Sequence, residues 1–249
     1  MKAVSELKVK IFGDGADLAG ILELSRLPYI KGFTTNPTLM RKAGVGDYAG
    51  FAAEVLRHIK TQPVSFEVFA DDEETMEEQA KHIASWAKNV YVKIPVTNTK
   101  REPMYGLIRR LSHEGIQVNV TAMMTLEQVR EVGKALQGGA ASNVSVFAGR
   151  VADTGRDPVP MMREAVEILR GNPKTELIWA SPRELLNIFH ADEIGCHIIT
   201  VTNDILAKLK LVGKDLADYS LDTVQMFHND AAKAGYTLDV AAASKAKSR

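Results

Sequence analysis

A lysine stands inside an apolar run of this chain. Lys93 lies in residues 91–96, Tyr-Val-Lys-Ile-Pro-Val, and the β-branched content of that run predicts a buried strand. Burial disfavours the ammonium form of a lysine and favours the neutral amine, which is the nucleophile that forms a Schiff base with a carbonyl compound. From this segment alone, a lysine that snorkels to solvent or pairs with an acid is an equally good interpretation. The elements around Lys93 favour catalysis.

Short β-branched runs alternate with amphipathic segments along the chain. Helical patterns such as residues 73–87 and 125–137 lie between the runs, and Thr125 with Gln128 three residues later is typical of a capping box. Strands that alternate with helices predict a parallel sheet. Eight such units fit a closed (β/α)₈ barrel, although a doubly wound open sheet would give a similar alternation. The expected strands cover residues 8–13, 31–35, 64–69, 89–95, 116–121, 143–148, 176–181 and 196–201.

The length and the end of the chain fit one large domain. A chain of 249 residues suits a single β/α barrel. Residues 202–236 add helical patterns, including 218–234, which would cap the barrel or pack on a neighbouring subunit. We therefore expect one domain over residues 1–240, a (β/α)₈ barrel with extra C-terminal helices, and a disordered basic tail over 241–249.

The side-chain alternation of the middle strands predicts a polar cluster. Each of these strands has one apolar face, and its opposite face carries polar groups near the carboxyl end. In a parallel barrel such faces converge on the interior, and active sites lie at the C-terminal mouth. Polar groups in one mouth are costly unless they bond to one another, so a functional cluster is favoured over structural burial. An antiparallel sheet with one wet face would alternate in the same way, but the intervening helices argue against it. The residues concerned are Glu67, Lys93, Asn119, Thr121 and Ser145.

Five segments of the chain, taken together and in order, resemble the transaldolase family. The match runs from about residue 8 to about residue 210. Members of that family are (β/α)₈ barrels whose Schiff-base lysine lies on the fourth strand, which is where the strand pattern places Lys93. The segments are Gly-Phe-Thr-Thr-Asn-Pro-Thr at 32–38, Tyr-Val-Lys-Ile-Pro-Val-Thr at 91–97, Asn-Val-Thr-Ala at 119–122, Ser-Val-Phe-Ala-Gly-Arg at 145–150 and Ala-Ser-Pro-Arg at 180–183.

The resemblance implies a role for each polar residue. Lys93 would form the imine with a ketose, and Asp14 resembles the general acid and base for the C4 hydroxyl. Glu67 and Thr121 resemble the pair that holds and activates a catalytic water. The implied substrate-binding residues are Asn36 and Asn119 for the dihydroxyacetone part, Ser145 and Phe147 beside it, and Arg150, Ser181 and Arg183 for the phosphate.

The resemblance favours the transaldolase branch of the family. Transaldolases, enzymes of the pentose phosphate pathway, pass dihydroxyacetone from a ketose phosphate to an aldose phosphate, whereas fructose-6-phosphate aldolases release it. The aldolase branch tends to carry Gln in place of Glu67 and Tyr in place of Phe147, and its counterparts of Asn119 and Ser145 are less polar. The chain departs from the family pattern at two places that bear on the phosphate geometry and the choice of acceptor. Residues 14–17, Asp-Gly-Ala-Asp, replace an Asp-Thr-Ser/Ala type of ending of the first strand, and Pro182 stands where an aromatic residue usually precedes the phosphate-binding arginine, here Arg183.

The amino-acid composition restricts the kinds of molecule that the protein is expected to bind. Lys+Arg and Asp+Glu number 31 each, so no net charge argues for nucleic acid or a membrane surface. No apolar stretch approaches the roughly 18 residues of a membrane span, and the start lacks the apolar core of a signal peptide. A single cysteine, Cys196, excludes an internal disulfide framework and fits a reducing cytosol. We therefore expect sugar phosphate substrates, a cytoplasmic location, and no binding of nucleic acid or membrane.

Three rival functions fit these residues less well. A metal-dependent aldolase is disfavoured because the six histidines show no ligand-like spacing, so we expect neither metal nor organic cofactor. A non-catalytic sugar-phosphate-binding barrel would keep the arginines but need not keep every catalytic position. A dinucleotide-binding fold is disfavoured because Gly13-Asp14-Gly15 is followed by no G-x-x-G. The resemblance also implies a ring-like homo-oligomer, a pentamer or decamer.

Overall fold

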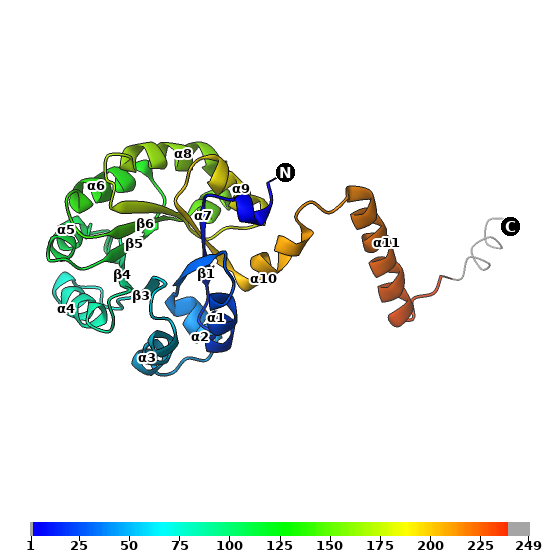
Figure 1. Ribbon diagram of the computed structural model, residues 1–249, viewed down its shortest axis with the longest axis horizontal. Helices are drawn as coiled ribbons and strands as arrows, with labels where there is room; N and C mark the ends of the chain where they lie inside the picture. The colour runs from blue at the N-terminus through cyan, green and yellow to red at the C-terminus, as the bar shows by residue number, and fades with distance from the viewer. Residues whose placement is uncertain (1, 239–249) are drawn as a thin grey trace, which may run out of the picture. The chain divides into compact units, whose positions relative to one another are not determined.

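Eight strands close into a parallel barrel. The computed structural model describes residues 2–238, in which each strand pairs with the next and the eighth pairs with the first (Figure 1). The closed ring excludes the doubly wound open sheet and confirms the (β/α)₈ prediction. All eight expected strands are present, with ends within two residues of those expected. They are β1 (Lys10–Asp14), β2 (Ile30–Thr34), β3 (Val64–Glu67), β4 (Val90–Pro95), β5 (Val118–Met123), β6 (Ser142–Val146), β7 (Thr175–Trp179) and β8 (Ile198–Thr202).

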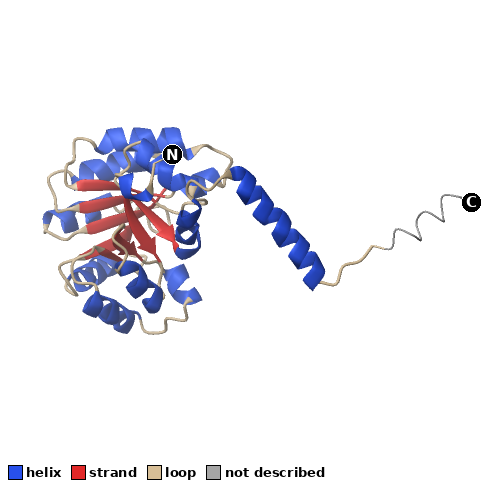
Figure 2. Ribbon diagram, turned by 45° about the vertical axis from the view of Figure 1, so that its right-hand side comes forward, coloured by secondary structure: helices blue, strands red, loops and turns tan. Residues whose placement is uncertain are grey.

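Helices surround the strands (Figure 2). The predicted capping box is confirmed, because Gln128 N donates to Thr125 Oγ1 at 3.2 Å and Gln128 Oε1 accepts from Thr125 N at 3.1 Å. The helical elements are η1 (Val4–Glu6), α1 (Leu18–Ser25), α2 (Pro37–Lys42), α3 (Tyr48–His58), α4 (Glu73–Ala84), α5 (Tyr105–His113), α6 (Leu126–Leu136), α7 (Ala148–Ala152), α8 (Pro158–Leu169), α9 (Leu186–Glu193), α10 (Asn203–Leu206), η2 (Ala207–Leu211) and α11 (Leu216–Lys233).

The two faces of the barrel wall differ in chemistry, as the alternation predicts. The outward face packs under the helices in one continuous apolar core that includes Phe66, Val92 and Val120. The interior holds a separate small apolar cluster with Phe12 and Ile178, and polar side chains make up much of the rest. This division leaves the polar groups inside the barrel and stabilises the wall by apolar burial. The buried polar residues of the interior are Thr34, Ser65, Lys93, Asn119, Thr121, Asn143, Ser145 and Thr200.

The chain divides into two compact units. One is the barrel, Lys2–Lys210, and the other begins at Leu211 and contains α11. Helix α11 is capped by Asp215, whose carboxylate accepts from the backbone N–H of Ala217 and Asp218. That residues 1–240 form one domain stays a prediction, and the expected tail at 241–249 lies outside the described residues. Among residues 2–238, no helix combines the length and apolar character that a membrane span requires.

Candidate active site

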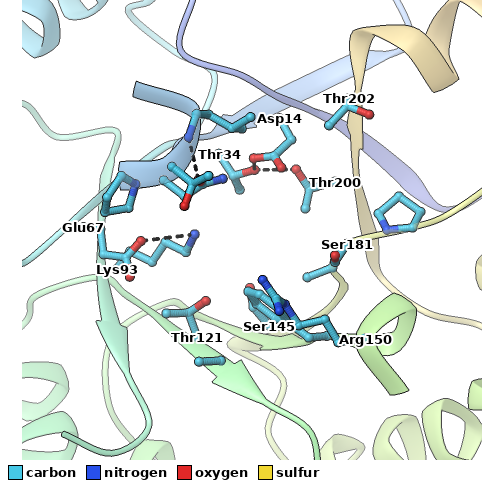
Figure 3. A pocket seen from close by; sticks show the side chains of 18 of the residues that line it. Asp14, Thr34, Glu67, Lys93, Thr121, Ser145, Arg150, Ser181, Thr200 and Thr202 are labelled. Atoms are coloured by element: carbon cyan, nitrogen blue, oxygen red, sulfur yellow. Dashed lines mark hydrogen bonds and ion pairs between the residues drawn. The ribbon is translucent and has the colours of Figure 1, made fainter. Parts of the chain in front are cut away.

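A cavity of about 620 Å³ opens at the carboxyl-terminal ends of the strands. Ten of the eleven residues singled out from the sequence line it: Asp14, Asn36, Glu67, Lys93, Thr121, Ser145, Phe147, Arg150, Ser181 and Arg183. Figure 3 shows several of these side chains converging from different strands. The eleventh, Asn119, is fully buried and is not among the lining residues.

Lys93 is held inside the barrel. Its side chain is 7% exposed, and its Nζ donates a 3.0 Å hydrogen bond to the backbone carbonyl of Thr35. The same nitrogen lies 3.5 Å from Oε2 of Glu67, because β3 and β4 pair with Glu67 opposite Lys93. The amine therefore does not snorkel to solvent. Lys93 does pair with an acid, but that acid, Glu67, lines the same cavity. The ion pair is therefore compatible with a catalytic role for Lys93.

Two carboxylates flank the amine. Burial raises the pKa of Asp14, and the positive charge of Lys93 offsets part of that rise. Burial likewise raises the pKa of Glu67, with Lys93 opposing the shift and the negative charge of Asp14 adding to it. Raised carboxyl pKa values bring both groups closer to neutral pH, where a general acid–base group exchanges protons efficiently.

Two threonines that we did not predict as site residues belong to this cluster. Thr34 Oγ1 donates to Oδ1 of Asp14 at 2.7 Å and is also hydrogen-bonded to Thr200 Oγ1 (Figure 3). Both hydroxyls line the cavity. The signal was present in the sequence, since Thr34 stands in the quoted 32–38 segment and strand alternation places Thr200 and Thr202 on one face. The aspartate is thus oriented by a short chain of hydroxyl groups.

Thr121 presents an unpaired hydroxyl to the cavity. Its Oγ1 is buried and has no hydrogen-bond partner among the described residues. The next residue, Ala122, has a φ of 64°, and the β5–β6 register shifts between Val120 and Met123. Such a local irregularity re-aims side chains and is frequent beside active sites. A buried hydroxyl of this kind needs a partner, and a water or a substrate oxygen would supply one.

Asn119 lies beneath the cavity wall and links three strands. Its amide nitrogen donates to Ser65 Oγ at 2.9 Å, and its oxygen accepts from Ser145 Oγ at 2.7 Å. This arrangement orients Ser145, which does line the cavity. Asn36 also has a structural bond, because its Oδ1 caps α2 by accepting from Leu39 N at 2.9 Å. Direct contact of either asparagine with a substrate stays a prediction.

The predicted phosphate-binding residues come from helix α7, which carries Arg150, and from the neighbouring segment after β7, which carries Ser181 and Arg183. Arg183 Nη1 donates to Ser181 Oγ at 2.9 Å, while its Nε and Nη2 donate to the carboxylate of Asp153 at 2.8 and 2.5 Å. Arg150 lies over the Phe147 ring, 5.9 Å from its centre. The Asp153 carboxylate therefore offsets the charge of Arg183, and the Arg150 guanidinium adds a second positive charge at this end of the cavity. Asp153 was not predicted, since its pairing with Arg183 depends on how β6 and β7 are arranged.

Close backbone packing joins helix α7 to the segment that follows β7. A Cβ on Gly149 would stand 1.6 Å from the carbonyl oxygen of Ser181, and Ser181 itself has a φ of 59°. Only a glycine at 149 permits this approach. It brings Arg150 and the Ser181–Arg183 segment to one side of the cavity.

No metal centre accompanies these groups within residues 2–238. There, no three or more His, Cys, Asp or Glu side chains gather closely enough to hold an ion. The carboxylates of the cavity instead surround an amine. Metal independence stays a prediction, which activity in the presence of a chelator tests.

The sequence matches the model of the family described as Transaldolase/Fructose-6-phosphate aldolase over residues 11–248. The chain belongs to the transaldolase/fructose-6-phosphate aldolase family. Three relatives carry the name probable transaldolase. The protein of Dehalococcoides mccartyi is 35% identical over 202 residues, 81% of this chain and 90% of the relative. The protein of Methanococcus maripaludis is 35% identical over 226 residues, which cover 86% of this chain and 99% of the relative. The protein of Thermoanaerobacter is 34% identical over 228 residues, which cover 91% of this chain and 99% of the relative.

A solved structure supports the fold of this transaldolase-family chain. The 2,3-dimethylmalate lyase, a member of the PEP mutase/isocitrate lyase superfamily, matches with a TM-score of 0.54 over 95% of this chain and 88% of its own. The two sequences are 13% identical, so the likeness concerns the fold alone. The family resemblance found in the motifs is confirmed by the sequence comparisons.

Proposed function

We propose that this protein is a transaldolase that transfers dihydroxyacetone from a ketose phosphate to an aldose phosphate through a Schiff base on Lys93. The observation that carries the proposal is the position of the Lys93 amine. It is buried at the barrel mouth, 3.5 Å from the Glu67 carboxylate and bonded to the Thr35 carbonyl. A buried amine beside two carboxylates of raised pKa suits imine chemistry.

Imine formation uses Lys93 and Glu67. The neutral amine adds to the C2 carbonyl of the ketose, and the resulting carbinolamine loses its hydroxyl as water to give the protonated imine. Glu67 supplies the proton that leaves with that water, and the unpaired hydroxyl of Thr121 holds the water. The same pair serves the reverse step, in which water releases the product.

Carbon–carbon cleavage uses Asp14. Its carboxylate takes the proton of the C4 hydroxyl, the C3–C4 bond breaks, and the bonding electrons form an enamine with the iminium. The aldose phosphate leaves. An acceptor aldose phosphate is then attacked by C3 of the enamine, and Asp14 returns its proton to the new hydroxyl. The bond from Thr34 to Asp14 keeps one carboxylate oxygen oriented during both steps.

The substrate phosphate is proposed to bind at the other side of the cavity. Arg150, Ser181 and Arg183 supply guanidinium and hydroxyl donors there, and guanidinium forks suit phosphate oxygens. This placement favours phosphorylated sugars over a carbohydrate without a phosphate.

We also propose that the protein works in the cytoplasm as a homo-oligomer. Helix α11 supports the second part of this proposal, because several of its large apolar side chains are exposed, including Val224 and Phe227 at 60% and 63%. Exposed apolar surface of this extent favours a protein partner. A second copy of the chain is the partner that the family resemblance implies.

A transfer assay tests the proposed reaction. Fructose 6-phosphate and erythrose 4-phosphate should yield glyceraldehyde 3-phosphate and a seven-carbon ketose phosphate, both with and without a chelator. Lys93→Met should abolish the transfer. Release of free dihydroxyacetone faster than transfer would instead assign the protein to the aldolase branch, and binding of sugar phosphates without turnover would indicate a non-catalytic barrel.

A further inference from the structure

Glu67 is the last residue of β3, and one side of its backbone lacks a strand to pair with. The β2–β3 ladder contains only Phe33 opposite Val64 and Thr34 opposite Ser65, with a last bond from Thr35 N to Ser65 O at 3.2 Å. Beyond that bond the chain turns away into α2. Backbone groups two residues apart point to the same side of a strand, so the N–H and C=O of Glu67 face the place that β2 has left.

A phenol takes the place of the missing strand. Tyr48 Oη accepts from Glu67 N at 2.7 Å and donates to Glu67 O at 2.9 Å. A tyrosine hydroxyl can do both at once, unlike a lysine or a carboxylate. Burial, with the nearby negative charge of Glu67, raises the pKa of Tyr48, so the phenol keeps the proton that it donates.

The ring that carries this hydroxyl is itself held in place. Tyr48 is the first residue of α3, and Asp47 caps that helix by accepting from Gly50 N at 2.9 Å. The ring packs edge-on against Phe69 and Phe66, with centres 4.5 and 6.2 Å away. Phe69, the last residue of the strand expected over 64–69, lies instead beyond the end of β3 and is 53% exposed, and its ring packs against that of Tyr48.

The chain beyond Glu67 is anchored as well. Gln79 of α4 accepts from Phe69 N at 2.7 Å and from Ala70 N at 2.9 Å. On the other side of the strand, Val68 N donates to Lys93 O at 3.1 Å. The backbone at Glu67 and Val68 is therefore hydrogen-bonded to β4 on one side and to Tyr48 on the other. All the bonds on the second side are made by one hydroxyl group.

We propose that Tyr48 is a positioning residue, which fixes the Glu67 carboxylate against Lys93 by binding both backbone groups of Glu67. The inference rests on the proposed function, in which Glu67 handles the proton transfers of the bound water. A tilt of the β3 end moves the carboxylate away from the amine and the water, whereas it leaves Asp14 and the phosphate end in place. Tyr48 lies outside every motif of the sequence and does not line the cavity.

The test is a double-mutant cycle of Tyr48→Phe with Glu67→Gln. Because a displacement of about 1 Å costs on the order of 100-fold in rate, Tyr48→Phe should lower kcat for transfer by roughly ten- to a hundred-fold, with KM for fructose 6-phosphate changed less. In the Glu67→Gln background the same change should cost less than about twofold, since residues that act through one another are not additive. Tyr105→Phe, which alters a tyrosine that also begins a helix, is the matched control and should leave kcat unchanged.

A second variant covers the case in which Tyr48→Phe does not fold. Phe69→Leu removes the nearest ring contact of Tyr48 at an exposed position, and it should lower kcat with the same dependence on Glu67. Equal losses with and without the Glu67 carboxylate would overturn the role of Tyr48 while the wild type still transfers. A wild type that forms no imine overturns the proposed function, and this inference with it.

Discussion

At the scale of single residues, the cavity combines the Lys93 amine, two buried carboxylates and two arginines, of which Arg150 lies over the Phe147 ring. Lys93 faces Glu67, Asp14 accepts from Thr34, and Arg183 is bound to Asp153. The catalytic carboxylates are buried and have raised pKa values, while the phosphate end is open to solvent. We therefore predict proton chemistry at one side of the cavity and anion binding at the other.

Glu67 should set a pH dependence. Its raised pKa means that the carboxylate takes up a proton as the pH falls through a midpoint above the ordinary value of 4.5. Product release, in which the carboxylate takes a proton from the bound water, should therefore fail in that range, and transfer should be lost with it. Glu67→Gln cannot titrate, and transfer should fall by about 10²- to 10⁴-fold at every pH, far more than retro-aldol cleavage. Glu74→Gln on the surface serves as control. Rate profiles of transfer that fall only below pH 4.5 would contradict this role.

The two arginines should differ in how they affect phosphate binding. Removing one charge-assisted contact costs about 1.5–3 kcal/mol, roughly ten- to a hundred-fold in KM. Arg150→Ala and Arg183→Ala should weaken phosphorylated sugars by this amount and leave free dihydroxyacetone almost unaffected. Arg183→Ala also leaves Asp153 unpaired, so adding Asp153→Asn should recover part of the loss. An Arg183 variant that weakens both kinds of substrate equally would remove Arg183 from the phosphate site.

At the scale of elements, local patterns predicted the strands and the residues that alternate along them. β-Branched runs located all eight strands, and alternation placed Glu67, Lys93 and Thr121 at the mouth. What the sequence did not reveal depends on partners that are far apart in the chain. Tyr48 binds the backbone of Glu67, where no strand pairs with it, and Asp153 binds the side chain of Arg183. Both contacts depend on the register with which the barrel closes. Asn119 lies on the interior face of β5, as alternation predicts, but its side chain is bonded to Ser65 and Ser145 and does not line the cavity.

The contact between helix α7 and the segment after β7 gives a prediction at this scale. Gly149→Ala puts a methyl group 1.6 Å from the Ser181 carbonyl oxygen, so the helix and the segment must separate. The variant should lose stability by roughly 1–3 kcal/mol and should discriminate less between phosphorylated and free sugars. Gly106→Ala in α5, where the nearest atom is 3.6 Å away, is the matched control. A Gly149→Ala enzyme with the melting temperature and KM of the wild type would contradict the packing.

At the scale of the whole molecule, the barrel and the unit that begins at Leu211 are expected to have different roles. The barrel holds the complete cavity within Lys2–Lys210. The second unit contributes α11, whose apolar side chains are exposed at 45–81% from Leu216 to Phe227. A helix with so many exposed apolar groups is expected to bind a partner.

The oligomer is tested by changing that helix. Light scattering coupled to gel filtration should give a mass several times 27.3 kDa for the wild type. Val224→Ser with Phe227→Ser, which alters neighbouring positions on the helix surface, should shift the protein toward the monomer. Gln225→Ser is the control on the same helix. A wild type that runs as a monomer at micromolar concentration would rule out the proposed assembly.

The Schiff base on Lys93 is the central claim, and borohydride trapping measures it most directly. The protein is treated with fructose 6-phosphate and sodium borohydride, digested, and examined by mass spectrometry. We predict one reduced three-carbon adduct, on the peptide that contains Lys93, and no adduct in Lys93→Met. An adduct on another lysine, or none from a preparation that turns over the substrate, would contradict it.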